Sequence, residues 1–414
     1  MFKRNVILFT FILIGVFVLT AVYAGDWSDA GYWKDGVWQT LSLPREAIDS
    51  STNESSSSSI VVSGDAAYIL GSYTDARGNN TPCYWRNGVL QNLNFPSGAT
   101  ETITNSIAVS GDVVFITGSY INAQNRRIPC YWRNGVLQNL NIPNGATFDR
   151  NYYNSNIAVS GDIVYITGSY NLQGNNFICY WRNGVIQNLN LPSGATEPSI
   201  SKMAVSGDVV YITGSYTIQN RSIPCYWRNG VIQNLNIPSG AENCYPTGIF
   251  VSGDTVYIAG SYIMQNRSVP CYWRNGVMQN LNIPSGTTNY STTDIAVSGD
   301  AVYIAGSYSD DDLYDMPFDS SACYWLNGVL HNLSLPDEAN NPNVSTRAIV
   351  MVGDNVYIAG AGIMFNYNGT ICYWRNGTAH IISIPMNFQN KYVRYTGFAV
   401  SGNSVYITAT FWMQ

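Results

Sequence analysis

Charged residues are scarce in this chain of 414 residues. They make up 11% of it, less than half of the roughly 25% that is usual in globular domains. Such a composition excludes a disordered tail, a coiled coil and a basic nucleic-acid-binding protein. The 20 basic and 26 acidic residues leave a net charge of −6, which is spread too thinly to predict a polyanion or an acidic membrane surface as the partner.

Histidine is nearly absent, and so are the common catalytic motifs. His331 and His380 each take a strand position that holds glutamine in other repeats of the chain. A general base must lie within hydrogen-bond reach of its partner in a pocket, so we expect two surface histidines. There is no nucleophile elbow, phosphate loop or metalloprotease helix motif, and no carboxylate pair suited to polysaccharide cleavage can be assigned. The sequence therefore predicts a protein that is not an enzyme.

Long apolar runs are confined to the N-terminus. Lys3 and Arg4 precede an apolar run over residues 6–22, and Val22 and Ala24 place small residues before a cut after Ala24. We expect residues 1–24 to be a signal peptide, with an uncleaved membrane anchor as the alternative, and residues 25–414 to form one domain. No later segment is apolar enough to span a bilayer. The predicted location is periplasmic, cell-surface or secreted.

Aromatic residues and glycine are abundant instead. Thirty tyrosines, eleven tryptophans and 37 glycines are typical of short strands joined by tight turns, which indicates an all-β fold. Two motifs recur eight times each. The motif YW(R/K)(N/D)G has its tryptophan at 33, 85, 132, 181, 227, 273, 325 (as YWLNG) and 374. The motif VSGDxVYIxGSY has its glycine at 64, 111, 161, 207, 253, 299, 353 and 402.

The spacing of 46 to 54 residues suits a unit of four short strands, the size of one propeller blade. We name these strands A to D. In the fourth repeat they are predicted at 203–206, 209–216, 223–228 and 231–237, with tight turns at Gly207-Asp208 and Asn229-Gly230. Strand B is apolar at consecutive positions, as expected where both faces of a sheet are buried. The sequence predicts an all-β, eight-bladed β-propeller of four-stranded antiparallel blades.

The order of the motifs predicts how the ring closes. The chain opens with a C-D hairpin over residues 32–44 and ends with an A-B hairpin over 399–412, so the eighth blade is assembled from both ends. An open array with a stray hairpin at each end is the alternative. The predicted blades span residues 58–96, 105–143, 155–192, 201–238, 247–284, 293–336, 346–385, and 395–414 together with 25–44.

In strand count and closure the chain resembles kelch and tryptophan-aspartate repeat propellers, and it looks like secreted bacterial propellers built on YWxNG repeats. The resemblance covers nearly all of residues 25–414 and implies the fold. It implies no known activity and no catalytic residues.

The lengths of the connections distinguish two faces. The A-B and C-D hairpins keep one length in all eight repeats, whereas the B-C and D-A connections vary. These two connections lie at the same end of an antiparallel blade, and insertions in repeat proteins often mark the binding face. We predict a non-catalytic exported binding, adhesion or scaffold module that holds a protein or surface partner on this face. The alternative is a multivalent carbohydrate-binding lectin with repeated sites.

Two candidate sites lie in these connections. The tyrosines that close strand B, together with Arg221 and Arg267, are predicted to line a surface for sugar or peptide groups, with packing between blades as the alternative. These tyrosines are Tyr73, Tyr120, Tyr170, Tyr216, Tyr262 and Tyr308. Carboxylates in the sixth B-C connection predict a calcium site, with a solvated acidic loop as the alternative. They are Asp310, Asp311, Asp312, Asp315 and Asp319. No other cofactor is expected.

The repeated turn charges and cysteines have structural interpretations. Aspartates of the A-B turns and arginines of the C-D turns form an inner acidic and an outer basic ring, which we expect to satisfy local backbone groups or each other. Seven of the eight cysteines precede Tyr-Trp in strand C and are expected in the core. Cys244 alone is out of register, and a disulfide with Cys225 or Cys271 is left open.

Overall fold

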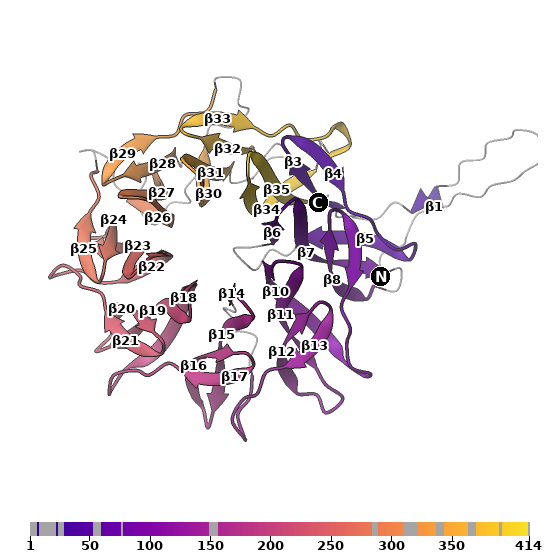
Figure 1. Cartoon of the computed structure of the whole chain (residues 1–414), viewed down its shortest axis with the longest axis horizontal. Coiled ribbons are helices and arrows are strands. Elements are labelled where there is room, and N and C mark those ends of the chain that lie inside the picture. The colour runs from indigo at the N-terminus through magenta and orange to yellow at the C-terminus, as the bar shows by residue number, and fades with distance from the viewer. Residues whose placement is uncertain are drawn as a thin grey trace, which may run out of the picture.

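The computed structural model describes residues 6–7, 22–23, 29–52, 59–75, 78–148, 156–283, 289–309, 321–336, 343–362, 370–388 and 391–412. Eight small antiparallel sheets stand like blades around a central axis (Figure 1). Each sheet has strand A next to the axis and strand D at the rim (Figure 1). The predicted all-β, eight-bladed propeller is confirmed.

Four blades follow one another from the N-terminal side of the ring. Blade I consists of β5 (Ala47–Thr52) and β6 (Ile60–Ser63), which share the strand A position, with β7 (Ala66–Asp75), β8 (Asn80–Arg86) and β9 (Val89–Asn92). Blade II consists of β10 (Thr100–Ser110), β11 (Val113–Ile121), β12 (Arg127–Arg133) and β13 (Val136–Asn139). Blade III consists of β14 (Ile157–Ser160), β15 (Ile163–Leu172), β16 (Asn175–Arg182) and β17 (Val185–Asn188). Blade IV consists of β18 (Thr196–Ser206), β19 (Val209–Ile218), β20 (Arg221–Arg228) and β21 (Val231–Asn234).

The other blades complete the circle. Blade V consists of β22 (Cys244–Ser252), β23 (Thr255–Met264), β24 (Arg267–Arg274) and β25 (Val277–Asn280). Blade VI consists of β26 (Asn289–Ser298), β27 (Ala301–Ser309), β28 (Ser321–Leu326) and β29 (Val329–Asn332). Blade VII consists of β30 (Val344–Val352), β31 (Asn355–Gly362), β32 (Ile371–Arg375) and β33 (Thr378–Ile381). Blade VIII consists of β34 (Tyr392–Ser401), β35 (Ser404–Trp412), β3 (Asp29–Lys34) and β4 (Val37–Thr40).

Blade VIII joins the two ends of the chain, as predicted. Strand β3 pairs antiparallel with β35, and Trp33 lies opposite Ile407 in this pairing. The N-terminal hairpin therefore supplies strands C and D of a sheet whose strands A and B come from the C-terminal end. This closure leaves no half-blade with an open inner edge.

Among the residues that the structure describes, little regular structure lies outside the blades. A two-stranded pairing joins β1 (Val6–Ile7) to β2 (Val22–Tyr23), and a short 3-10 turn, η2 (Met386–Phe388), follows β33. Most of the predicted signal peptide lies outside the described residues. Within the parts of the chain that the structure describes, no helix is long and apolar enough to cross a membrane.

The C-D turn ties strand C back to strand B. In blade IV, Asn229 and Gly230 have φ values of 48° and 82°, which is the left-handed pair that a tight hairpin requires. The Asn229 side-chain Oδ1 accepts a hydrogen bond from the Val210 amide at 3.0 Å. The Asn229 amide donates to the Val210 carbonyl at 2.9 Å. The same side-chain contact is made by Asp35, Asn87, Asn134, Asn183, Asn275, Asn327 and Asn376.

The strand C tryptophans join each blade to the one before it. All eight are almost fully buried, and each indole N–H donates to a backbone carbonyl just after strand D of the preceding blade. The donor–acceptor distances are 3.2 Å for Trp33–Ser383, 2.8 Å for Trp85–Ser42, 2.8 Å for Trp132–Asn94, 2.8 Å for Trp181–Asn141, 3.0 Å for Trp227–Asn190, 2.6 Å for Trp273–Asn236, 2.9 Å for Trp325–Asn282 and 3.0 Å for Trp374–Ser334.

The glycine of the GSY segment makes room for this tryptophan. A Cβ built on Gly260 would lie 2.8 Å from Cζ3 of Trp273 and 2.7 Å from the Tyr245 carbonyl oxygen. Both contacts are closer than carbon atoms tolerate, so only glycine fits beside the indole. The repeated glycine and the repeated tryptophan are therefore two halves of one packing arrangement.

The cysteines lie in the core, as expected for seven of them. All eight are buried and free, so the disulfide left open for Cys244 is not formed. Burial raises the pKa of the Cys244 thiol to about 12, against a lowering contribution from the Tyr245 backbone. Thiols of this kind are small apolar core residues and are poor nucleophiles.

Removing one indole N–H should weaken the contact between two blades. We expect Trp273→Phe to lower the free energy of unfolding by about 2–4 kcal/mol, because the Asn236 carbonyl loses its donor and a small cavity opens. Denaturant unfolding followed by circular dichroism measures this change. Trp38→Phe is the matched control, since no side-chain hydrogen bond from Trp38 to another described residue is observed. Equal losses for the two variants would show that the hydrogen bond contributes nothing.

Thiol counting tests the free state of the cysteines. At about pH 8 the native protein should react with Ellman's reagent at none of its thiols within minutes, because burial keeps them protonated. After unfolding in guanidinium without reductant, all eight should react. A count two lower would show a disulfide and contradict the structure.

Candidate functional site

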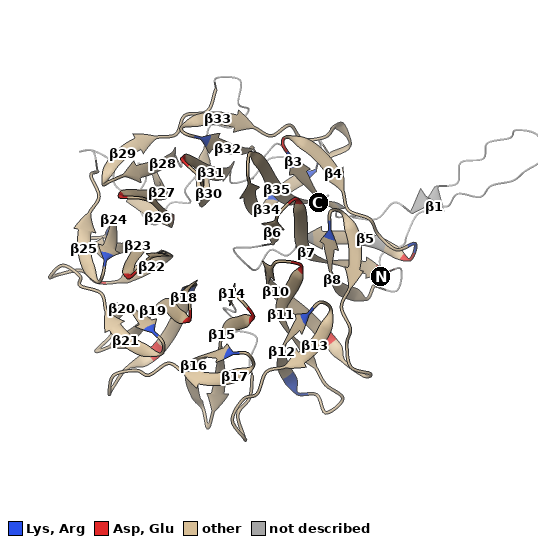
Figure 2. Ribbon diagram, in the orientation of Figure 1, with Lys and Arg blue, Asp and Glu red and all other residues tan. Residues whose placement is uncertain are grey.

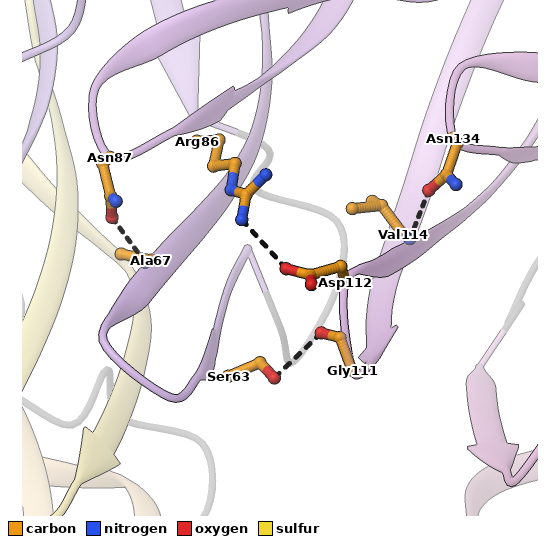
Figure 3. Close-up of polar contacts among 8 residues, drawn as sticks. All are labelled: Ser63, Ala67, Arg86, Asn87, Gly111, Asp112, Val114 and Asn134. Carbon is orange, nitrogen blue, oxygen red and sulfur yellow. Dashed lines mark hydrogen bonds and ion pairs between the residues drawn. The ribbon is translucent and has the colours of Figure 1, made fainter.

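The face formed by the A-B and C-D turns, here called the turn face, is closed by contacts between blades. Acidic residues of the turn face lie nearer the axis and basic residues farther out (Figure 2). The guanidinium of Arg86 in blade I lies 2.9 Å from Oδ1 of Asp112 in blade II, and Ser63 donates to the Gly111 carbonyl at 3.0 Å (Figure 3). Arg182–Asp208 and Arg228–Asp254 repeat the ion pair at 3.7 and 3.8 Å.

These turn charges are therefore engaged with neighbouring blades. Most of the repeated arginines also cover a tyrosine of their own strand B, as Arg86 covers Tyr68 with 5.6 Å between the guanidinium carbon and the ring centre. The two histidines have a similar place at the rim. His331 stacks on Tyr324 at 4.8 Å, and His380 stacks on Tyr373 at 4.7 Å, so each imidazole takes part in a cross-strand ring contact.

The opposite face, here called the loop face, carries the B-C and D-A connections. Four of the predicted tyrosines, Tyr120, Tyr170, Tyr216 and Tyr262, are buried, and the other two, Tyr73 and Tyr308, are half-buried. The hydroxyls of three donate to an asparagine of strand D in their own blade. The pairs are Tyr120–Asn139 at 3.2 Å, Tyr170–Asn188 at 3.1 Å and Tyr216–Asn234 at 3.0 Å.

The remaining predicted site residues also have definite places. Arg221 and Arg267 are exposed at the start of strand C, and the guanidinium of Arg221 donates to the Ala241 carbonyl at 3.1 Å. The ligand role of these arginines and of the tyrosines stays a prediction. The acidic segment with Asp310, Asp311, Asp312, Asp315 and Asp319 lies outside the described residues. Among the residues that are described, no three His, Cys, Asp or Glu side chains gather in a way that could hold a metal ion.

A cavity of about 220 Å³ lies on the axis, between the A strands of blades II to VII. Its polar lining comes from Lys202 of β18, Asp294 of β26 and Arg347 of β30, with Ser106 of β10 and an asparagine. The asparagine, Asn156, directly precedes β14. We call Lys202, Asp294 and Arg347 the axial triad.

Irregularities in strand A place these side chains at the axis. In blades II to IV a buried strand B threonine accepts a hydrogen bond from a backbone amide of the innermost segment, as Thr213 does from Lys202 at 3.1 Å beside the bulge of blade IV. In blades V to VII alanine replaces this threonine, and the extra residue of the bulge moves one position earlier. Arg347 is that extra residue in blade VII, between the paired residues Thr346 and Ala348. A β-bulge redirects a side chain in this way.

The neighbouring blades show what the axial triad replaces. Asp294 stands where blades V and VII have Gly248 and Ala348, and Arg347 stands where blade VI has Thr293. Thr293 hydrogen bonds to the hydroxyl of Thr346 at 2.8 Å, which links blades VI and VII. Small or hydroxylated residues are thus the ordinary occupants of these positions. The charges of the axial triad are local departures from the repeat.

The protein around Asp294 and Arg347 disfavours their charged forms, although the Arg347 side chain remains exposed to the cavity. Burial raises the pKa of the Asp294 carboxyl, while Lys202 and the Ile295 amide act in the opposite direction. Burial lowers the pKa of Arg347, and the charge of Arg394 lowers it further, while Tyr395 opposes both. Among the described residues, no opposite charge lies within 4.0 Å of Lys202, Asp294 or Arg347. Shifted, unpaired charges in a cavity are typical of functional sites.

The axial triad escaped the sequence-based prediction. The three charges belong to three repeats and two different register positions, so no common motif marks them. One signal was available: the glycine of the GSY segment, which reads GAG in repeat seven, is preceded by threonine in repeats two to four but by alanine in repeats five to seven. That change coincides with the change in the bulge.

Comparison with known proteins finds only distant structural similarity. No family model and no curated protein matches the chain, so the resemblance to a particular propeller family is not confirmed. An acylaminoacyl peptidase of Pyrococcus horikoshii is similar at 8% identity and a TM-score of 0.46, over 86% of this chain and 57% of the peptidase. Extracellular domains 1-2 of Drosophila Semaphorin 1a are similar at 11% identity and a TM-score of 0.41, over 81% and 87%.

The prediction that the chain is not an enzyme is corrected by these comparisons. The similar structures also include a puromycin-hydrolyzing peptidase of Mycobacterium tuberculosis, a family-43 glycoside hydrolase and a β-fructofuranosidase of Bombyx mori. Propellers thus occur in hydrolases, and the lack of common catalytic motifs does not exclude activity. At 9 to 11% identity and TM-scores of 0.27 to 0.42, no activity is carried over to this chain.

The turn face allows two kinds of contact to be compared. We expect Asn134→Gly to lower the free energy of unfolding by about 1 to 2 kcal/mol, because glycine keeps the positive φ but leaves the buried Val114 amide without its acceptor (Figure 3). Asp112→Ala should cost less than about 1 kcal/mol, since its ion pair is exposed. Denaturant unfolding of both variants gives the comparison. A larger loss for Asp112→Ala would contradict it.

Proposed function

We propose that this protein is an exported binding module that holds a protein or surface partner on its loop face. The propeller itself fits a binding or scaffold role. Export rests on the predicted signal peptide at residues 1–24. The observation that supports the use of the loop face is the contrast between the two faces of the ring.

The two faces differ in how their side chains are used. Ion pairs and serine–carbonyl bonds engage the turn face from blade to blade, its turn asparagines bond within their own blades, and its hairpins have one length throughout. The loop face varies in length and carries exposed aromatic and methionine side chains, whereas the exposed apolar side chains of the turn face are the valines that begin strand D. Met386 is 88% exposed, Tyr245 50% and Phe177 39%. Exposed aromatic and methionine side chains are the groups that protein interfaces favour.

The aromatic pair of blade III illustrates this surface. Phe177 stacks on Tyr170 with ring centres 5.3 Å apart and planes 14° from parallel. Tyr170 is buried and fixed by Asn188, so Phe177 rests on a rigid support. At the corresponding position other blades have Thr81, Ile128, Ile223, Val269 and Ser321. A surface that differs from blade to blade suits one partner better than a repeated lectin site.

Crosslinking in living cells tests the use of the loop face. A photoreactive phenylalanine at Tyr245 or at Phe177 should give a discrete protein adduct, since both side chains are exposed on that face. The same residue at Val136, which is 54% exposed at the turn-face end of strand D, is the matched control and should give none. Cell fractionation should place the protein outside the cytoplasm.

Three outcomes would contradict the proposal. Adducts from Val136 but from neither loop position would assign the partner to the other face. Retention of the protein in the cytoplasm would remove the export. Binding on a glycan array that falls about tenfold or more in Tyr216→Ala, without any protein adduct, would favour the lectin alternative.

A further inference from the structure

The axial cavity holds charges that the folded protein does not pair internally. Lys202, Asp294 and Arg347 come from blades IV, VI and VII and line one space of about 220 Å³. Lys202 and Asp294 are half-buried and Arg347 is exposed, so all three charges stay accessible to a ligand. The propeller scaffold does not require charge there, since other blades fill these positions with glycine, alanine, serine, threonine or asparagine.

The position of the Asp294 carboxylate is defined by two neighbouring backbone groups. Its Oδ1 accepts a hydrogen bond from the Ile295 amide at 2.9 Å. A Cβ built on Gly248 of the neighbouring blade would lie 2.5 Å from the same oxygen. Glycine at position 248 therefore leaves the space that the carboxylate occupies, and the backbone fixes its orientation. Its second oxygen, Oδ2, has no hydrogen-bond donor among the described residues.

The positive side of the cavity is equally well defined. Arg347 extends from a bulge, and Tyr395 lies close enough to Arg347 and Asp294 for both to affect its pKa. Burial raises the pKa of Tyr395 well above its ordinary value, so its hydroxyl stays neutral. Lys202 comes from β18 of blade IV, three blades before Arg347. One acceptor and two cationic donors thus face a common space.

We propose that the axial cavity binds a small organic zwitterion, with its ammonium group at Asp294 and its carboxylate at Arg347 and Lys202. A free α-amino acid and a short peptide share this chemistry. Arginine offers a carboxylate two parallel hydrogen bonds, and charge-assisted bonds of this kind are the strong ones. A simple anion lacks a group for Asp294, and a simple amine lacks one for the two cations.

The size and the apolar lining of the cavity agree with such a ligand. Drug-sized ligands occupy pockets of roughly 300–1,000 Å³, so a cavity of about 220 Å³ suits a smaller molecule. Ile107, Ile157, Met203 and Ile249 also line it. These side chains provide an apolar surface for the carbon skeleton of the ligand.

Calorimetric titration of the purified protein tests the site. The probes are the α-amino acids and a set of dipeptides. Each one that binds is compared with the matched carboxylate, amine and hydroxy acid. We expect at least one zwitterion to bind about tenfold or more tightly than all three matched compounds, because each of these lacks or weakens one charge-assisted contact. A preference for amino acids or for dipeptides identifies the source of the ligand.

Single substitutions assign the contacts. Asp294→Asn should weaken the zwitterion about tenfold or more and leave the matched carboxylate nearly unchanged, whereas Arg347→Gln and Lys202→Gln should weaken both. Arg86→Gln, on the turn face, is the matched control and should bind as the parent does. Thermal unfolding checks the fold of each variant, and Asp294→Asn should melt no lower than the parent.

Several results would overturn the proposal. They are the binding of no zwitterion, equal affinity for the matched hydroxy acid, and unchanged affinity in all three axial variants. None of these results depends on the loop face. Variants at Tyr245 and Phe177 should leave the affinity of the axial cavity for the zwitterion unchanged. The proposal for the loop face and the proposal for the axial cavity are therefore tested independently.

Discussion

The bond from each tryptophan indole to a carbonyl of the preceding blade is the contact on which the rest of the structure depends. Hydrophobic burial alone would let adjacent sheets slide over one another, because burial has no preferred direction. Each indole N–H donates to one acceptor, at the end of strand D of the preceding blade. This directional bond fixes both the height and the angle of each blade relative to that neighbour. Between Trp33 and Ser383 the same bond closes the circle. The same contact is thus repeated at every interface of the ring.

The packing between blades also determines where charged side chains can lie. Strands B and C are covered on both sides by neighbouring blades, so their side chains must be apolar, small or fully hydrogen-bonded. The places that remain for charged side chains are the turns, the rim and the axis. Turn charges bind the next blade, as Arg86 binds Asp112. At the axis the A strands face an open space, and a bulge can aim a long side chain into it without disturbing the interblade contacts. Lys202, Asp294 and Arg347 use this freedom.

The fold could be predicted from the repeats because the residues that make its main contacts recur several times in the sequence. Tryptophan, Asn-Gly and GSY recur in register, and the order of motifs at the two ends required a shared blade. The details of strand A were harder to predict. In blade IV strand A was predicted at residues 203–206, yet β18 begins at Thr196, because the bulge near Lys202 interrupts the apolar pattern before the strand resumes. The axial triad was missed for the same reason: the residues of this region differ among repeats.

Departures from a repeat are of two physical kinds. In blade VIII, Ala409 stands where the other blades have the GSY glycine, but its partner Gly31 replaces the usual cysteine, and Trp38 fills the space beside Gly31. That departure is compensated within the blade, and the packing is restored. The axial charges differ, because no described residue neutralises Asp294, Lys202 or Arg347 at salt-bridge distance. These side chains make no salt bridge that would contribute to the stability of the ring. An uncompensated departure therefore points to a ligand as the missing partner.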